Sequence, residues 1–227
     1  MSSNLKPIKL WGVGSANPPK VHMLLAELGL PFEGIPIAYA DLKKPAFLAI
    51  NPNGRIPAIQ DPNTDITVWE SAAILQYLVD KYDAEHRLSF EFGSKEYYEV
   101  TEWLFFQASG QGPYYGQLAW FTKFHHEQLP SAKERYKKEV QRVTGVLESH
   151  LHKQKEKFAK AGGDGPWLVG NKYSVADIAW IAWQQIILMV VEDAWNPKEF
   201  PLVQEWQEKM KARKAIGDVM KTLPKGH

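Results

Sequence analysis

The sequence predicts an α/β domain followed by an all-α domain. In the first part of the chain, short apolar runs typical of strands alternate with segments whose apolar residues recur at helical spacing. After a polar segment at residues 83–94, the apolar residues recur only at helical spacing. We therefore expect one domain over residues 1–86 and a second over residues 94–227, and 227 residues are enough to give each its own core.

The order of elements in the first domain defines its fold. The sequence predicts strands over residues 8–13 and 32–37 around a helix that ends at Gly29, then a hairpin and a last helix. The hairpin pairs residues 57–60 with 66–69, and the helix follows over 71–82. This βαβ–ββα order within about eighty residues is typical of a thioredoxin-like domain, a small sheet with helices on its faces.

The second domain begins with a helix from Ser94 to Gln107 that Gly110 and Gly112-Pro113 are expected to disturb. Two capping signals open later helices: Ser131-x-x-Glu134, and Ser174-x-x-Asp177 before an apolar helix over residues 178–191. A final helix is predicted over residues 201–213. The helix after Ser131 carries an apolar stripe, which consists of Tyr136, Val140, Val143, Leu147 and Leu151.

Composition excludes several classes of function. The 27 lysines and arginines nearly balance the 26 aspartates and glutamates, so there is no basic field to attract nucleic acid or an anionic membrane. The chain has no cysteine, which rules out disulfides, thiolate metal sites and protein-thiol redox chemistry, and favours a cytoplasmic location. The paired histidines lack the spacing of metal ligands, and no apolar run is long enough to span a membrane. We expect no metal.

Two motifs suggest a small-molecule site. The segment from Asn51 to Pro57 places an extended backbone beside a proline, where its amide and carbonyl groups can pair with a ligand lying alongside as a false strand. Glu70 and Ser71 stand at the start of an apolar helix, whose free amides can hold a carboxylate while Glu70 holds an ammonium group. Together they fit an amino-acid-like zwitterion attached to a peptide bond, which describes glutathione.

These motifs, with Ser174-x-x-Asp177 after Trp167-Leu168-Val169-Gly170, resemble the glutathione transferase family over essentially the whole chain. The segments from Trp103 to Pro113 and Glu134-Arg135-Tyr136 are similar to those of one subgroup. That subgroup contains the yeast nitrogen-catabolite regulator and the bacterial Nu-class disulfide-bond reductases. The resemblance implies a cis peptide bond between Ile56 and Pro57 and a two-fold homodimer.

Sulfur activation is the central chemical question, because a free thiol with a pKa near 8.5 is mostly protonated at neutral pH. Lowering that pKa by about two units requires roughly 2.7 kcal/mol of preferential thiolate stabilisation. The segment that follows the first strand has no Tyr or Cys, but Ser15 and Asn17 can each donate a hydrogen bond to sulfur. Asn17 could instead be an ordinary N-cap; since Pro19 has no N–H, only Lys20 would remain as its donor.

The other candidate glutathione ligands are Asn53, Ile56 through its backbone, Pro57, Glu70 and Ser71. Each has a structural alternative: Asn53 could serve only its Asn-Gly turn, Ser71 could cap its helix, and Glu70 could complement the helix dipole. A second-substrate pocket is expected in the helical domain, with Phe106, Gln107 and Tyr114 as candidates. Aromatic residues at helical spacing are, however, more often part of a core.

Three functions are compatible with the sequence. The first is a transferase that adds the glutathione thiolate to hydrophobic electrophiles. The second uses the same site to reduce small disulfides or peroxides with glutathione. The third is a non-catalytic regulatory member of the family, against which the complete set of Asn17, Glu70 and Ser71 argues. The expected partners are therefore glutathione and a hydrophobic electrophile, peroxide or disulfide.

Overall fold

The computed structural model describes residues 5–223; residues 1–4 and 224–227, at the ends of the two expected domains, lie outside this range. Four strands form one sheet in the order β2-β1-β3-β4: β1 (Ile8–Trp11), β2 (Phe32–Ile35), β3 (Ala58–Asp61) and β4 (Ile66–Trp69). Strand β1 pairs parallel with β2 and antiparallel with β3, which pairs antiparallel with β4. This sheet, followed by a helical domain, confirms the predicted fold class.

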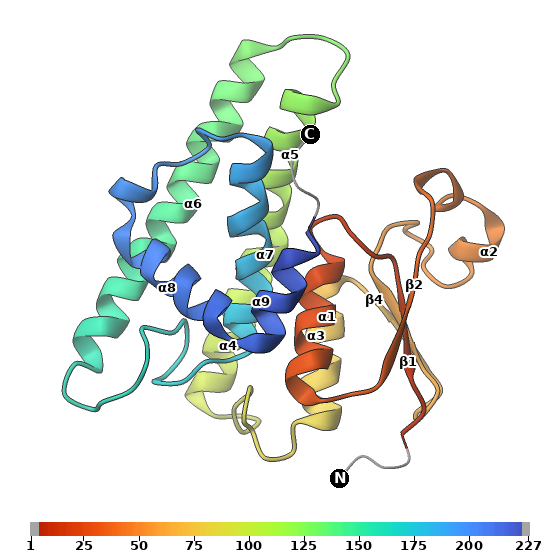
Figure 1. Cartoon of the computed structure of the whole chain (residues 1–227), viewed down its shortest axis with the longest axis horizontal. Helices are drawn as coiled ribbons and strands as arrows, with labels where there is room; N and C mark the ends of the chain where they lie inside the picture. Colours follow the sequence, from red (N-terminus) through yellow and green to blue (C-terminus); the bar gives the residue numbers. More distant parts are fainter. Residues whose placement is uncertain (1–4, 224–227) are drawn as a thin grey trace.

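Two helices cover the face of the sheet that meets the second domain (Figure 1). Helix α1 (Pro18–Leu28) ends at Gly29, whose φ of 67° is the left-handed value that a C-terminal glycine adopts readily. Helix α3 (Ser71–Tyr82) has the predicted bounds. Strand β2 ends at Ile35, two residues before its predicted end. Residues 38–50, left unassigned by the sequence pattern, contain a short 3₁₀ turn (Tyr39–Asp41) and helix α2 (Pro45–Leu48), which lies beyond the sheet from the helical domain (Figure 1).

The first helix of the second domain changes its pitch instead of breaking. Helix α4 (Lys95–Phe106) continues through a π-helical turn (Gln107–Gln111) into α5 (Gly112–Lys123). The predicted disturbance is therefore confirmed, and it takes the form of a wider turn. Pro113 contributes to the change of pitch because it cannot donate a backbone hydrogen bond to the preceding turn. Gly110 is needed within the turn because a Cβ there would lie 2.7 Å from the Phe106 ring.

Helix α6 (Pro130–Lys157) buries four residues of its predicted stripe and leaves Tyr136 half-buried, but its predicted capping box is wrong. Pro130 is the first helical residue and Leu129 is the N-cap, so Ser131 already lies within the first turn. The Leu129 carbonyl accepts the backbone hydrogen bonds of Ala132 and Lys133, both at 3.1 Å. Pro130 accounts for this earlier start, since its fixed φ favours the first helical position.

Helix α7 (Val175–Val190) is the centre of the helical core, and the second predicted capping box is confirmed. The Asp177 carboxylate is fully buried and accepts from the Ser174 and Leu168 amides at 3.0 Å and from the Trp206 indole at 2.9 Å. It thus joins the start of α7 to the preceding loop and to a later helix. Among residues 5–223, no helix combines the length and hydropathy needed to cross a membrane.

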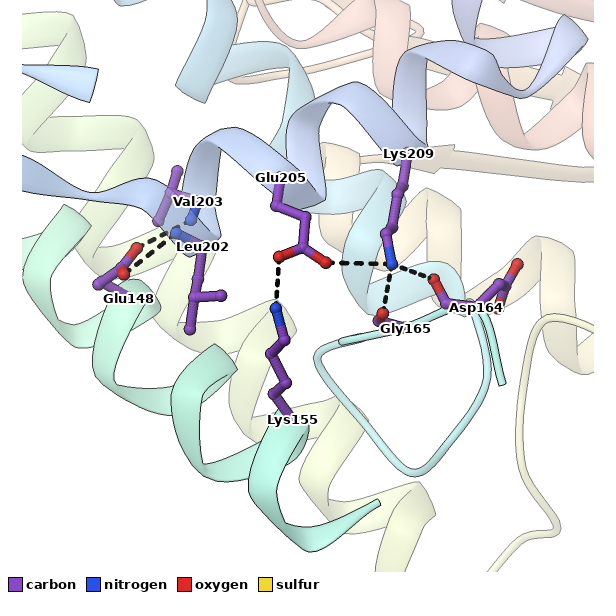
Figure 2. A network of polar contacts seen from close by, with 8 residues as sticks. All are labelled: Glu148, Lys155, Asp164, Gly165, Leu202, Val203, Glu205 and Lys209. Atoms are coloured by element: carbon purple, nitrogen blue, oxygen red, sulfur yellow. Dashed lines mark hydrogen bonds and ion pairs between the residues drawn. The ribbon is translucent and has the colours of Figure 1, made fainter. Parts of the chain in front are cut away.

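Helix α8 (Pro201–Ala212) matches the predicted final helix, but α9 (Lys214–Lys221) follows it and was not predicted. Figure 2 shows how α8 is attached to α6. The Glu148 carboxylate accepts from the backbone amides of Leu202 and Val203 at 3.1 and 2.8 Å. These amides lie in the first turn of α8 and have no partner within the helix, so Glu148 caps α8 from a neighbouring helix.

A second group of contacts in Figure 2 involves Glu205 and Lys209, in the middle and later part of α8. Glu205 accepts from Lys155 of α6 at 2.7 Å and pairs with Lys209 at 3.2 Å. Lys209 in turn donates to the carbonyl oxygens of Asp164 and Gly165. The loop after α6 is thereby tied to α8 through one lysine that serves several acceptors.

We predict that Asp177→Ala lowers the free energy of unfolding far more than Ser174→Ala does. The Asp177 change leaves three buried N–H donors without an acceptor, at about 1–3 kcal/mol each, whereas loss of a Ser cap costs about 1 kcal/mol. Urea denaturation of both variants measures the difference. Equal destabilisation by the two changes would contradict this account of the α7 cap.

Candidate functional site

The loop between β1 and α1 forms one wall of the site. Strand β1 ends at Trp11, two residues before its predicted end, and Gly12, with a φ of 90°, turns the chain out of the sheet. A Cβ at Gly12 would lie 2.5 Å from the Ile56 side chain, so only glycine allows this loop to approach the Ile56–Pro57 segment. The exposed Ser15 has a φ of 62°, an uncommon conformation for a residue other than glycine.

Asn17 occupies the N-cap position of α1, but its side chain makes no capping hydrogen bond. Its Oδ1 instead accepts from the indole N–H of Trp183, on α7, at 3.0 Å. An indole can only donate, so the amide oxygen must face Trp183 and the NH₂ group must face the other way. The structure therefore presents Asn17 as a hydrogen-bond donor whose orientation is set by the helical domain.

The Asn51–Pro57 segment is a tightly held turn. The buried Asn51 side chain donates to the Arg55 carbonyl at 2.6 Å and accepts from the Asn53 amide at 2.9 Å. The Ile56–Pro57 peptide bond is cis, as the family resemblance implies. Among residues 5–223, the backbone N–H and C=O of Ile56 make no hydrogen bond, so both can pair with a ligand.

Glu70 and Ser71 adjoin this turn at the start of α3. Glu70 is the N-cap residue, with a φ of 70° and a ψ of 117°, so Ser71 is not the cap but the first helical residue. A strained backbone at a non-glycine residue is typical of functional sites. The Asn53 amide donates to the Glu70 carboxylate at 3.3 Å, so the structure brings together two of the predicted ligands from separate motifs.

Lys20 was not among the predicted site residues. It lies three residues after Asn17 on α1 and is only 1% exposed. Its Nζ donates to Gln107 Oε1 at 2.7 Å and to Ser71 Oγ at 3.4 Å. Burial lowers its pKa to about 7, against the opposing effect of the Glu70 charge. A sequence signal did exist, because helical spacing places Lys20 beside the apolar positions of α1.

The three predicted second-substrate residues have different environments. Gln107 is buried, and its amide oxygen is occupied by Lys20. Phe106 is half-buried against Trp180, with ring centroids 5.1 Å apart, which places it in an aromatic cluster of the core. Tyr114 is half-buried, and the Arg142 guanidinium lies 6.0 Å from its ring centroid. Gln107 is thus engaged with the first domain, Phe106 with the core and Tyr114 with α6, and their role in a second-substrate pocket stays a prediction.

In residues 5–223, no three His, Asp or Glu side chains are grouped so that they could hold an ion. The groups gathered around the start of α1 and α3 are amides, hydroxyls, one carboxylate and one ammonium. Such groups suit an organic zwitterion that is held by hydrogen bonds and charge.

Comparison with known proteins gives matches over both domains. Residues 14–81 match the family model for the glutathione S-transferase N-terminal domain, and residues 113–214 match that for the C-terminal domain. The chain is 55% identical over 215 residues to the glutathione S-transferase-like protein tpcF of Aspergillus fumigatus, which covers 94% of each chain.

Solved structures agree. The crystal structure of glutathione transferase URE2P8 from Phanerochaete chrysosporium with oxidized glutathione has a TM-score of 0.86 and 40% identity, over 97% of this chain and 96% of that one. Ure2p in complex with S-hexylglutathione has a TM-score of 0.87 and 34% identity, over 96% and 100% of the two chains. With both domains matched in order and identities well above those of a shared fold alone, this chain belongs to the glutathione transferase family.

Proposed function

We propose that the chain binds glutathione and activates its thiol for attack on hydrophobic electrophiles. The observation that carries this proposal is the orientation of Asn17, whose NH₂ group is turned away from Trp183 at the start of α1. An amide N–H that donates to sulfur stabilises the thiolate over the thiol, and so lowers the thiol pKa. The exposed Ser15 hydroxyl, on the same loop, is the candidate second donor.

The remaining groups account for binding of the tripeptide. Glu70 suits the ammonium group of the γ-glutamyl residue, and Ser71 with the first amides of α3 suits its carboxylate. The Ile56 backbone, beside cis Pro57, suits the peptide backbone of the cysteinyl residue. Asn53 holds the Glu70 carboxylate at 3.3 Å and so belongs to the same site.

Chemically, the bound thiolate attacks an electrophilic carbon; a carbon–sulfur bond forms while a leaving group departs or a conjugated double bond takes up a proton. Pro18 and Pro19 remove two amides from the start of α1, which weakens the stabilisation that the helix itself gives to an anion. The side chains of Asn17 and Ser15 therefore carry more of it. This is a reason to expect large effects when they are changed.

Glutathione-dependent disulfide reduction is the second candidate, favoured by the related URE2P8 structure with oxidized glutathione. In that reaction the glutathione thiolate attacks a mixed disulfide, releases a free thiol and leaves oxidised glutathione. The chain has no cysteine, so every sulfur must come from the substrates. Parallel assays of glutathione with an aryl halide, a hydroperoxide and a mixed disulfide distinguish the candidates, and inactivity in all three assays would favour a regulatory role.

We predict that Asn17→Ala lowers kcat at neutral pH by about 100-fold, the lower end of the ~100–1000-fold range for loss of one donor to an anion. Glutathione affinity should change little, because Glu70, Ser71 and Ile56 still hold the peptide. Glu70→Ala should do the reverse and raise KM. Steady-state kinetics of the two variants test this; full activity in Asn17→Ala with loss of activity in Ser15→Ala would assign activation to the hydroxyl.

The Trp183 bond gives a second prediction. Trp183→Phe keeps an aromatic ring but removes the N–H that orients Asn17, so kcat should fall by about 3- to 10-fold, the cost of one neutral hydrogen bond. In the Asn17→Ala background the same change should have little further effect, because there is no amide left to orient. A double-mutant cycle on kcat measures this coupling; independent effects of the two changes would contradict it.

We also propose that the chain forms a homodimer, as the family resemblance implies. Two surface regions carry large exposed apolar side chains: Ile66 and Trp69 on β4, and Tyr98 and Phe105 on α4, of which Phe105 is 70% exposed. The neighbouring Trp103 is buried, so Phe105 is the better candidate for contact with a second copy.

Light scattering at micromolar concentration should therefore give about twice the monomer mass of 25.9 kDa. Phe105→Asp should shift the protein towards the monomer, because it places a charge in an apolar contact. The exposed Phe124, which directly follows the last residue of α5, serves as a matched control: Phe124→Asp should leave the mass unchanged. A wild-type mass near that of the monomer would contradict the dimer.

A further inference from the structure

Lys20 brings a charged group to the boundary between the two domains. It extends from α1 of the first domain, and its ammonium contacts Ser71 of α3 and Gln107 of the π-helical turn. We propose that Lys20 is a positioning residue, an inference that rests on the proposed glutathione site. Lys20 orients the Ser71 hydroxyl so that it can donate to the γ-glutamyl carboxylate, and Gln107 holds the Lys20 ammonium in place.

The number of hydrogen-bond donors and acceptors at Ser71 supports this role. A charged lysine side chain has three N–H donors and no acceptor, and a serine hydroxyl has one proton and two lone pairs. When Lys20 donates to Ser71 Oγ, the serine proton is free to point to another acceptor. A carboxylate beside Ser71 would take that proton, and it would also gain the field of the nearby ammonium.

Gln107 is itself held in one orientation. Its Nε2 donates to Gln111 Oε1 at 3.1 Å, so its oxygen must face Lys20. Gln111 Nε2 donates to the Trp180 carbonyl and to Gln184 Oε1, both at 3.2 Å. A chain of buried amides therefore runs from Lys20 into the core of the helical domain, with every donor direction determined.

The π-helical turn is what makes this chain possible. Gln107 and Gln111 are its first and last residues, and the wider turn presents both side chains to the buried side of the helix. Single π-helical turns occur frequently at functional sites. This geometry also accounts for the direction of the Gln107 side chain, whose amide oxygen accepts from Lys20 of the first domain.

The electrostatic surroundings of Lys20 make its charge responsive to a ligand. Burial lowers its pKa to about 7, Glu70 is the charged group whose field raises the pKa, and the contacting Ser71 and Gln107 are neutral. Trp183, which faces α1 from α7, is also neutral. A bound carboxylate beside Ser71 would raise the Lys20 pKa further.

The charged side chains at the start of α9 face a different part of α1 from Lys20. Arg213, just before α9, and Lys214 and Asp218 on it line a cavity together with His22 and Glu27 of α1. Arg213 pairs with Glu27 through two hydrogen bonds of 2.8 and 3.0 Å. The groups expected to set the protonation of Lys20 are therefore Glu70 and the ligand.

The test uses S-hexylglutathione, which has both carboxylates and the ammonium of glutathione but no ionisable thiol. Calorimetry at pH 7.5 in two buffers with different heats of ionisation measures affinity and proton uptake together. For the wild type we expect uptake of a fraction of a proton, and an affinity that falls as the pH rises from 7 to 8.5, since the bound form holds its proton more tightly.

Lys20→Met should bind about 10- to 100-fold more weakly, the cost of losing a hydrogen bond to a charged group. Lys20→Met should also lose the part of the proton uptake that Lys20 causes in the wild type. Because the same ligand titrates in both proteins, the difference between them reports Lys20. Lys81→Met, which changes an exposed lysine on α3, is the matched control and should behave as the wild type does.

Gln107→Leu provides a second readout that a purely structural role would not move. It removes the acceptor of the Lys20 ammonium, so the pH at which affinity falls should shift downwards. Thermal unfolding of Lys20→Met should stay close to that of the wild type, since removing a buried charge offsets the lost hydrogen bonds. Unchanged affinity and proton uptake in Lys20→Met, or an unchanged pH profile in Gln107→Leu, would overturn the inference. Failure of the wild type to bind S-hexylglutathione would overturn the proposed function as well.

Discussion

The hydrogen bond from Trp183 to Asn17 is the interaction on which the proposed site depends. Asn17 belongs to the first domain, but the direction of its amide is set by an indole of the second domain, 3.0 Å away. If the amide flipped, two N–H groups would face each other and a donor would lose its partner, at a cost of about 1–3 kcal/mol. The amide that we propose as the donor to sulfur is therefore oriented without any ligand.

A second polar side chain, one helical turn after Asn17, is also held by a residue of the helical domain. Lys20 also projects from α1 and is held by a side chain of the helical domain, Gln107. Both polar residues at the start of α1 are thus fixed from across the domain boundary. The helical domain therefore determines how the first domain presents these polar groups.

Backbone conformation supports this positioning. Ser15 and Glu70 have positive φ angles, and each costs of order 1–3 kcal/mol in strain. Gly12 allows the loop that carries Ser15 to approach Ile56, and the buried Asn51 holds the turn before it. Strain and close approach are thus concentrated where the loop of α1, the cis-proline turn and the start of α3 converge.

Sequence reasoning succeeded where the interactions are local. The hairpin, the bounds of α3 and the cap at Ser174 depend on residues a few positions apart, and all three are confirmed. The cap at Ser131 failed because Pro130 starts the helix earlier. Trp183 and Lys20 were missed because their partners are 166 and 87 residues away. Helical spacing could have indicated that Lys20 is buried, but it could not have identified the residue that Lys20 contacts.

The most direct test of the account is the pKa of the glutathione thiol bound to the protein, followed by the ultraviolet absorbance of the thiolate as pH is varied. For the wild type we expect a pKa about two units below the free value near 8.5, and for Asn17→Ala a return of at least one unit towards it. An unchanged bound-thiol pKa in Asn17→Ala would contradict the claim that this oriented amide activates the sulfur.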